Sequence, residues 1–589
     1  MNILIEPVHI GIIQTLISFI FISGFIFCGS VITSRIFKDY NNLLFNLLLS
    51  IVLLSQLLKI ITIFGFFKQA NLIFSFFIFF VGIYNLKYFY ALIDKKNIHI
   101  PKNVFEISVI FLMLVFFLIS IAPPSMADAL DYHYGFPLYL LRFNEIPNPY
   151  LWINAAVAGN GEFINSLPMY LGTDNFGSLL QFFVLIFFLL FLRKKIKNKK
   201  KLLFLYIFVL SSPTLLQLIS GPKFLLFPQV LTAIALFLVL EKKKIENVDF
   251  IFITILLMGA SQFKLSFLLS GSIIGSYLFF KSFIHSKIKI KILTSSLILS
   301  IIFFGPTFFW HYSQLIDFNY RNIFSAMPLE RIHSLQNYRE NFRYIYPFNL
   351  VLPNGIGSIS SILGFQFLVL FFIFKKQKKI NHLIVLTIST IFLHYLLSMN
   401  EARIYYEFIL WLAVGIFFLN DESINYAFFS KILFVQLLAV LCMSLYFAAI
   451  SLPSIFSNIS RDEFMQRNSI EYDAFKWINK VLPDDAKIMS ELRSVSFYKN
   501  EFVPMDMLSG NISKLKLNKY LSIIKEKKID YIVLRNNSKY ITLLKDCIGN
   551  KYLQSPLLIK STRNPFNRNH KYFISIYEFN SKDVLNCVK

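Results

Sequence analysis

Apolar runs of about 20 residues recur along this chain and constrain its fold more than any other feature. A run of this length crosses the hydrocarbon core of a bilayer as an α-helix. Of the 589 residues, 56% are hydrophobic and only 15% are charged, whereas a soluble protein has roughly 25% charged residues. The pattern predicts a polytopic α-helical membrane protein with about fourteen spans. These are residues 8–33, 42–66, 70–92, 104–122, 174–192, 202–220, 223–240, 249–264, 266–284, 292–311, 356–374, 381–399, 403–419 and 427–451.

The net charge of +25 follows the loops between these runs. Lys and Arg gather in short loops such as 193–201, 281–291 and 375–379, which is typical of cytoplasmic loops and makes nucleic acid the poorer interpretation of the charge. The long loops 123–173 and 312–355 and the tail then lie outside. The loop 420–426 is the exception, because it should be cytoplasmic but has no basic residue. We expect a bacterial inner-membrane protein with a periplasmic tail.

The tail differs in composition from the rest of the chain. Its charged residues increase and its apolar runs shorten to strand length, which predicts a membrane domain at 1–454 and a small extracytoplasmic α/β domain at 455–589. Helices are expected at 473–481 and 515–527, and strands at 487–489, 531–534 and 571–579. Cys547 and Cys587 could form a disulfide if the tail lies in an oxidising compartment.

Two carboxylates, Asp128 and Asp131, directly follow the fourth apolar run. Residues three apart share one face of a helix. An acid at the outer surface can deprotonate an acceptor hydroxyl or amine, and a second acid, with or without a divalent cation such as Mg or Mn, can orient the acceptor or neutralise a phosphate. The alternative for Asp128 is a capping box with Ser125, which leaves Asp131 and the nearby His133 unexplained.

Several cations are expected at the same membrane face. Lys223 lies in a tight hairpin, Lys264 interrupts an apolar run, and Arg403 opens a span. Charged groups beside spans are costly and often functional. Each could instead snorkel to the interface, and Arg403 could pair with Glu401. Their convergence on the acid-bearing face would form a phosphate site.

The second outer loop is rich in Arg, His and Tyr, and includes Arg331 and Arg339. These side chains could contact a sugar or a phosphate. The alternative is a solvated interfacial helix.

Taken together, these features resemble the GT-C superfamily of integral-membrane glycosyltransferases, which includes bacterial protein mannosyltransferases and aminoarabinose transferases. The resemblance is carried by the spans, the outer-loop sequence Asp128-Ala-Leu-Asp131-Tyr132-His133, the juxtamembrane helix after it, and the small outer domain. The tail sequence from Ala474 to Ile488 is similar to the start of such domains. One departure is that the acidic loop follows the fourth span, whereas it follows the first in better-known members.

The resemblance implies an inverting transfer from a polyprenyl-phosphate-linked sugar to a lipid, glycan or protein acceptor. Asp128 or Asp131 would be the base and the lipid phosphate would leave. Tyr132 and His133 would lie beside the substrate, and Lys223, Lys264 and Arg403 would contact its phosphate. Three rivals remain. The first is a polysaccharide polymerase or ligase, which depends more on outer-loop arginines, and the second is a lipid-linked oligosaccharide flippase or transporter. The third is a non-enzymatic scaffold, which gives no reason for Asp131 and His133 at the interface. We find no internal repeat of the kind that transporters often have.

Overall fold

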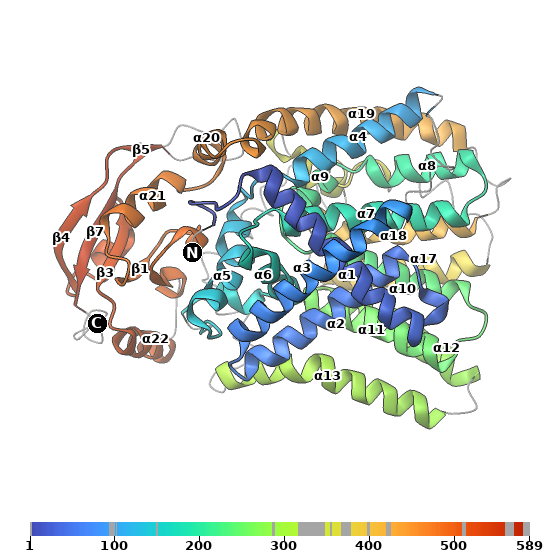
Figure 1. Ribbon diagram of the computed structural model, residues 1–589, viewed down its shortest axis with the longest axis horizontal. Helices are drawn as coiled ribbons and strands as arrows, with labels where there is room; N and C mark the ends of the chain where they lie inside the picture. Colours follow the sequence, from blue (N-terminus) through green and yellow to red (C-terminus); the bar gives the residue numbers. More distant parts are fainter. Residues whose placement is uncertain are drawn as a thin grey trace.

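The computed structural model describes residues 3–92, 101, 103–148, 151–285, 289–315, 348–353, 356–366, 378–396, 401–419, 426–508, 514–559 and 571–580. Most of these residues form a body of helices packed side by side, and a smaller unit built on a β-sheet lies at one end of it (Figure 1). The expected fold class, a helical membrane protein with a small C-terminal α/β unit, is confirmed. Arg331 and Arg339 lie outside the described residues.

The first half of the body includes the helices that surround the acidic loop. In chain order they are α1 (Gly11–Arg35), η1 (Lys38–Tyr40), α2 (Leu43–Ile63), α3 (Phe67–Leu92), α4 (Val104–Ser120), η3 (Ala129–His133), α5 (Tyr134–Phe143), η4 (Ile153–Val157), α6 (Asn160–Tyr170) and α7 (Phe176–Lys195). The predicted outer loop 123–173 is therefore folded, and α6 packs against α2 and α3.

The second half of the body completes the bundle. Its elements are α8 (Lys199–Leu210), α9 (Thr214–Ile219), α10 (Leu226–Glu241), α11 (Asn247–Phe263), α12 (Phe267–His285), α13 (Lys289–Leu315), η5 (Phe348–Leu350), η6 (Ile356–Ser361), α17 (Lys378–Leu396), α18 (Ala402–Phe418), α19 (Tyr426–Ser451) and η8 (Leu452–Ile455). Within the described residues, 6 helices are long and apolar enough to cross a membrane, and shorter apolar helices accompany them. The count of about fourteen spans is not confirmed.

The predicted span 202–220 is two helices instead of one. Helix α8 ends before Ser211, and α9 begins just after Pro213. Proline has no amide hydrogen and clashes with the preceding turn, so it interrupts a helix. The freed polar groups find partners nearby: Ser212 Oγ donates to the carbonyl of Leu363 at 2.8 Å, and Gln436 Nε2 donates to the carbonyl of Ser211 at 2.6 Å. These partners are far away in the sequence, which is why hydropathy alone did not reveal the break.

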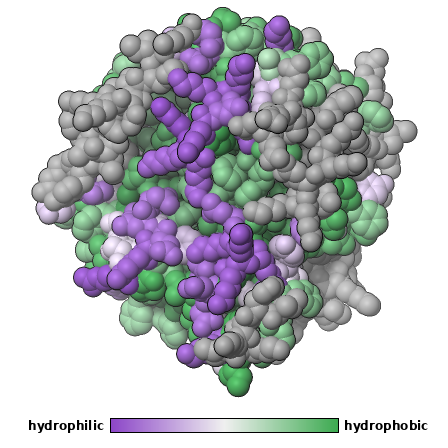
Figure 2. All heavy atoms as spheres, turned by 90° about the vertical axis from the view of Figure 1, so that its right-hand side faces the viewer, coloured by the Kyte–Doolittle hydropathy of each residue, from purple (hydrophilic) through white to green (hydrophobic). Residues whose placement is uncertain are grey.

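The end of the helical body that faces away from the sheet unit carries many basic residues. Figure 2 looks at the end that faces away from the sheet unit, and hydrophilic residues form a band across it. The C-terminal ends of α7 and α10 meet there through the ion pair between Lys195 and Glu241 at 2.6 Å. The exposed Arg193 and Lys194 lie in the last turn of α7, and the exposed Lys199, Lys200, Lys243 and Lys244 follow the two helix ends. The basic segments 193–201 and 242–244, which were predicted to be cytoplasmic, therefore lie opposite the sheet unit.

The sheet unit follows α20 (Asn458–Asn468) and α21 (Tyr472–Val481). Its five-stranded sheet has the order β2-β1-β3-β7-β4, in which β1 is parallel to β2 and β3, and β7 is antiparallel to β3 and β4. The strands and the remaining helices are β1 (Lys487–Ser490), η9 (Val495–Phe497), β2 (Glu501–Pro504), η10 (Met505–Leu508), α22 (Lys514–Lys527), β3 (Tyr531–Arg535), α23 (Lys539–Leu543), β4 (Ile548–Gln554), β5 (Leu558–Ile559), β6 (Lys571–Tyr572) and β7 (Ile574–Phe579). Central β3 is an apolar run because both of its faces are covered.

The helices and strands expected in the tail are present, and the expected strand at 571–579 is interrupted at Phe573. Cys547 is disulfide-bonded, and its expected partner Cys587 lies outside the described residues.

Polar side chains join the sheet unit to the helical body. The guanidinium of Arg461 on α20 forms a buried ion pair with Asp174, which lies just before α7. Arg142 on α5 donates to the carbonyl of Tyr498. Lys499 pairs with Glu6 at 3.0 Å. The contact of Arg142 with Tyr498 holds the segment after β1 against α5, which directly follows the segment that bears the acid pair.

Candidate functional site

The acid pair lies where a helical span gives way to irregular backbone. Helix α4 ends at Ser120, and Pro123 and Pro124 follow before the chain enters η3, which is a π-helix from Ala129 to His133. Such a wider turn often occurs at functional sites and changes the direction of the side chains relative to an α-helix. The expectation that both acids share one α-helical face is therefore wrong in its geometry.

The two carboxylates have different environments. The side chain of Asp128 is 25% exposed, and that of Asp131 is 3% exposed. The capping box with Ser125 does not form, since Ser125 Oγ is buried and makes no hydrogen bond within the described part of the chain. Asp128 instead turns towards basic side chains.

Three cations surround Asp128. Lys223, in the turn between α9 and α10, has its Nζ 2.6 Å from Asp128 Oδ2, and Arg403, in the first turn of α18, has its Nη1 3.5 Å from the same oxygen. Arg493, which follows β1, forms an ion pair with Asp128 Oδ1. Burial alone would raise the pKa of Asp128, but Lys223, Arg493 and Arg403 outweigh it and hold that pKa well below its usual range.

Asp131 is held by neutral donors and one cation. Trp152 Nε1 donates to Asp131 Oδ1 at 3.1 Å, Asn154 Nδ2 donates to Oδ2 at 2.6 Å, and Arg493 Nε lies 3.7 Å from Oδ2. Arg493 therefore contacts both acids. Through these contacts Asp131 holds Trp152 and Asn154, which lie around η4, and it orients the guanidinium of Arg493, which also reaches Asp128.

The two residues after Asp131 form a second polar layer. Lys264, at the end of α11, lies over the ring of Tyr132, with Nζ 4.7 Å from the ring centroid and 3.1 Å from the hydroxyl oxygen. His133 Nδ1 pairs with the buried carboxylate of Glu162 on α6, whose other oxygen accepts from the amide of Gly159 at 2.6 Å. Burial, reinforced by Lys264, lowers the pKa of His133 despite Glu162. This layer fixes Tyr132 beneath the acid pair.

The structure brings together all the predicted site residues that it describes. Asp128, Lys223 and Arg403 are in direct contact, Asp131 joins them through Arg493, and the remaining three form the layer beside them: Tyr132, His133 and Lys264.

Four further residues of this cluster were not predicted: Trp152, Asn154, Glu162 and Arg493. Glu162 is an acid in a largely apolar stretch of sequence, and this feature could have identified it as a candidate. Arg493 is 362 residues from Asp131 and has no neighbouring motif, so its role depends on the packing of the sheet unit against the body.

The metal site expected at Asp128 and Asp131 stays a prediction, and the residues present do not favour it. Within the described ranges, no group of three or more His, Cys, Asp or Glu side chains is placed to hold a metal ion. Both acids already contact cationic side chains, which would repel a divalent cation.

We expect the Lys223→Met variant to lose stability in a pH-dependent way. Removing the lysine takes away one of the positive charges that oppose the effect of burial, so the pKa of Asp128 rises. Near pH 7 the variant should be about 1–3 kcal/mol less stable than wild type. The deficit should shrink towards pH 4, about the pKa of an unperturbed Asp, as the carboxylate, still paired with Arg493 and Arg403, takes up a proton more readily than in wild type. In the wild type, the ion pairs of Asp128 contribute their full stability above the pKa of this carboxyl group in the unfolded chain, which is roughly 3.9. The contribution is lost only as the pH falls through the lower pKa that Asp128 has in the folded protein.

The measurement is the apparent melting temperature of both proteins in detergent at the two pH values. Lys195→Met is the matched control, because its pair with Glu241 is solvent-exposed and should contribute little at either pH. A deficit for Lys223→Met that is the same at both pH values would show that Asp128 is not the titrating group.

Two family models match adjoining parts of the chain. The DUF1420 N-terminal domain family matches residues 10–465, and the DUF1420 C-terminal domain family matches residues 466–589. No curated protein matches the chain in sequence. Among solved structures, the crystal structure of ArnT from Cupriavidus metallidurans in the apo state is similar, with 10% identity, a TM-score of 0.43, and coverage of 82% of this chain and 98% of that one. A similarity this distant assigns no residue role and no substrate to this chain.

Proposed function

The chain belongs to the DUF1420 family, and we propose that it is an integral-membrane glycosyltransferase of the bacterial inner membrane. It would move a sugar from a polyprenyl-phosphate-linked donor to a lipid, glycan or protein acceptor. The reaction would take place on the periplasmic face, in the synthesis of a cell-surface glycan, glycolipid or glycoprotein. The sheet unit would be periplasmic, because the basic loops lie at the other end of the body (Figure 2).

The observation that carries this proposal is the partly exposed carboxylate of Asp128 ringed by Lys223, Arg403 and Arg493. Lys and Arg side chains are the usual protein partners of phosphate oxygens. The cluster lies at the N-terminal ends of α10 and α18, where a membrane lipid would present its headgroup. One acid among three cations suits a reaction in which a hydroxyl loses a proton while a phosphate departs.

The proposed step is an inverting displacement at the anomeric carbon of the donor sugar. The acceptor oxygen forms the new bond to this carbon, and the bond from the carbon to the phosphate oxygen breaks. The lipid phosphate leaves with the bonding electron pair, and Lys223, Arg403 and Arg493 stabilise its charge. The proton of the acceptor hydroxyl passes to Asp128.

Binding of the donor would change the basicity of Asp128. In the described structure its carboxylate is paired with cations, and a carboxylate with a depressed pKa is a weak base. A phosphate that takes these cations as its own partners leaves Asp128 less neutralised, so the pKa of Asp128 rises when the donor is bound. The carboxylate then becomes a better base at the moment when the acceptor needs one.

The surrounding residues would position these groups. Asp131 is buried and fully engaged by Trp152, Asn154 and Arg493, so its proposed role is to orient the Arg493 guanidinium. Tyr132, held under Lys264, would line the sugar site. Arg331 and Arg339 stay candidates for substrate contacts, and the polymerase or ligase alternative depends on them.

A strain without this protein tests the proposal. We expect it to accumulate a polyprenyl-phosphate sugar on the outer face of the inner membrane and to lose one surface glycan or glycolipid. Mass spectrometry of lipid extracts, with and without treatment of spheroplasts by membrane-impermeant periodate, measures both quantities. The wild-type gene should restore the pattern, and the gene encoding Arg403→Gln should not.

Other outcomes would point to the rivals. Accumulation of a lipid-linked sugar that periodate cannot reach would favour a flippase. A surface glycan that is shortened but still attached would favour a polymerase. Either result would contradict the transferase proposal.

A further inference from the structure

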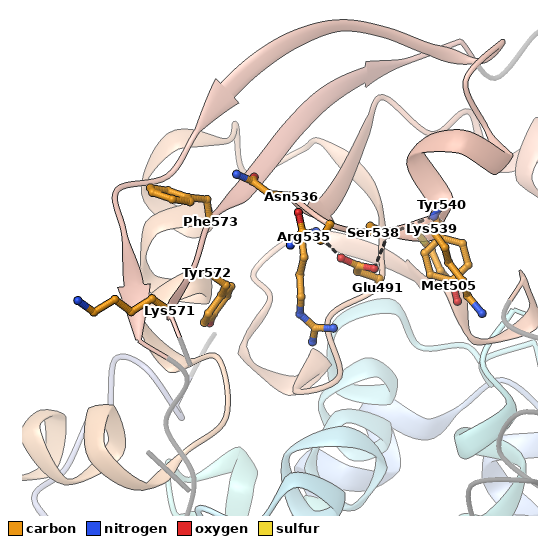
Figure 3. A pocket seen from close by; sticks show the side chains of 11 residues that line it. Glu491, Met505, Arg535, Asn536, Ser538, Lys539, Tyr540, Lys571, Tyr572 and Phe573 are labelled. Atoms are coloured by element: carbon orange, nitrogen blue, oxygen red, sulfur yellow. Dashed lines mark hydrogen bonds between the residues drawn. The ribbon is translucent and has the colours of Figure 1, made fainter. Parts of the chain in front are cut away.

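The sheet unit contains a cleft that is separate from the acid cluster. Its volume is about 870 Å³. Figure 3 shows the cleft with Tyr572 on one side, Tyr540 on the other, and Arg535 and Glu491 between them. The remaining lining residues are Met505, Asn536, Asn537, Ser538, Lys539, Lys571 and Phe573.

The cleft lies where the topology of the sheet leaves a crevice. Strand β1 has β2 on one side and β3 on the other, all parallel, and the chain leaves β1 towards β2 but leaves β3 towards the opposite half of the sheet. Connections that diverge in this way open a crevice at the carboxyl ends of the two strands, and ligands of open α/β sheets bind at such points. Glu491 directly follows β1, and Arg535 ends β3.

The lining combines aromatic, amide and cationic groups. The rings of Tyr572 and Phe573 offer partly exposed apolar faces, and Asn536 offers an exposed amide. Lys539 and Lys571 bring exposed positive charge to the two sides of the cleft (Figure 3). Such a surface can stack against the carbon face of a sugar ring, bond its hydroxyls and pair with an acidic substituent.

The middle of the cleft is held in place by ordered contacts. Ser538 Oγ donates to Glu491 Oε2 at 2.7 Å, and the amide of Arg535 donates to the other oxygen of this carboxylate. The guanidinium of Arg535 pairs with Glu471, whose side chain is buried. Glu491 and Arg535 therefore serve to keep the loops after β1 and β3 together, and the two lysines supply the positive charge.

The cleft is connected to the acid cluster through one short loop. Glu491 lines the cleft, and Arg493, two residues later, contacts Asp128 and Asp131. Glu471 holds both sides of this connection, because it pairs with Arg535 and accepts from the amide of Arg493 at 3.0 Å. A molecule bound in the cleft would therefore lie against the same loop that supplies a cation to Asp128.

We propose that this cleft binds an anionic saccharide, either free or carried on a lipid. Its role as the site that holds the acceptor glycan rests on the proposed transferase function, whereas saccharide binding itself does not.

Equilibrium binding to the purified full-length protein in detergent tests the proposal without any need for activity. The probes are tetragalacturonate, its uncharged methyl ester, and dodecyl glucuronide as a lipid-carried acidic sugar. We expect an acidic probe to bind at least about tenfold more tightly than the methyl ester, because two charge-assisted contacts are lost with the ester. The Lys539→Ala/Lys571→Ala variant should bind the same acidic probe on the order of tenfold more weakly than wild type.

The control variant is Lys525→Ala/Lys551→Ala, which removes the same charge from exposed positions of the sheet unit outside the cleft. It should bind like wild type. Tyr572→Ala, which keeps every charge, should also weaken binding if a sugar ring stacks there.

Each outcome has one meaning. Binding of tetragalacturonate identifies a free glycan, and binding of dodecyl glucuronide alone identifies a lipid-carried one. Equal affinity for the acid and its methyl ester, equal weakening by both double variants, or no binding of either acidic probe would overturn the proposal. A cleft that binds sugar in a protein without transferase activity would leave this inference standing and refute the proposed function.

Discussion

We expect the Asp128→Asn variant to lower the rate of sugar transfer by about 10²- to 10⁴-fold, the usual contribution of a general base. Asparagine keeps the size of the side chain but cannot accept the acceptor's proton. It also leaves Lys223 and Arg403 without their shared carboxylate. The measurement is the rate of transfer from a polyprenyl-phosphate sugar in membranes, with the amount of membrane-inserted protein determined in the same samples.

Two matched variants decide how this result is interpreted. Asp462→Asn removes a partly exposed acid on α20 that pairs with Lys476, far from the acid cluster in the chain, and it should leave the rate unchanged. Asp131→Asn should cost less than Asp128→Asn if Asp131 only orients Arg493. A larger loss for Asp131→Asn would make Asp131 the base. Full activity of both variants, with losses on substituting Arg331 or Arg339, would favour the polymerase or ligase alternative.

The Arg461→Met variant should have the largest effect on stability, about 3–5 kcal/mol. The ion pair between Arg461 and Asp174 is almost fully buried, with side-chain exposures of 3% and 1%. Removing the arginine leaves the carboxylate of Asp174 uncompensated at the junction between the helical body and the sheet unit. The measurement is the midpoint of thermal unfolding in detergent, together with protease sensitivity of the segment around α20.

A double variant separates the loss of the pair from the loss of packing. Replacing both partners, in Arg461→Met/Asp174→Leu, removes the stranded charge and should recover most of the lost stability, because apolar substitutes for a buried pair are often nearly neutral. If the double variant is as unstable as Arg461→Met alone, the arginine contributes through its packing and not through its charge.

Hydropathy alone was enough to predict most of the helical body. Helices α1, α2 and α7 are long apolar segments that must satisfy their backbone polar groups internally in a bilayer, so their existence follows from local composition. The break between α8 and α9 does not follow from hydropathy, because Pro213 lies within an apolar run, and the polar groups at the break find their partners in distant segments.

The candidate site, too, could be predicted from the sequence only in part. Asp128, Asp131, Lys223 and Arg403 were recognisable as charged groups beside apolar spans, where a charge is costly without a partner or a function. Which acid faces solvent and which is buried could not be predicted, since the π-helix at 129–133 and the segment around Trp152 decide it.

The sequence by itself determined the membrane fold, the α/β tail, and the gathering of the acids Asp128 and Asp131 with nearby cations. These properties depend on the composition of contiguous segments, and the composition of a segment is the same wherever the segment lies in the fold. Only the tertiary structure decided that Arg493 completes the ring around Asp128, that Glu162 pairs with His133, and that a cleft opens at the carboxyl ends of β1 and β3. These contacts join residues far apart in the chain, and their geometry exists only once the sheet unit has packed against the helices.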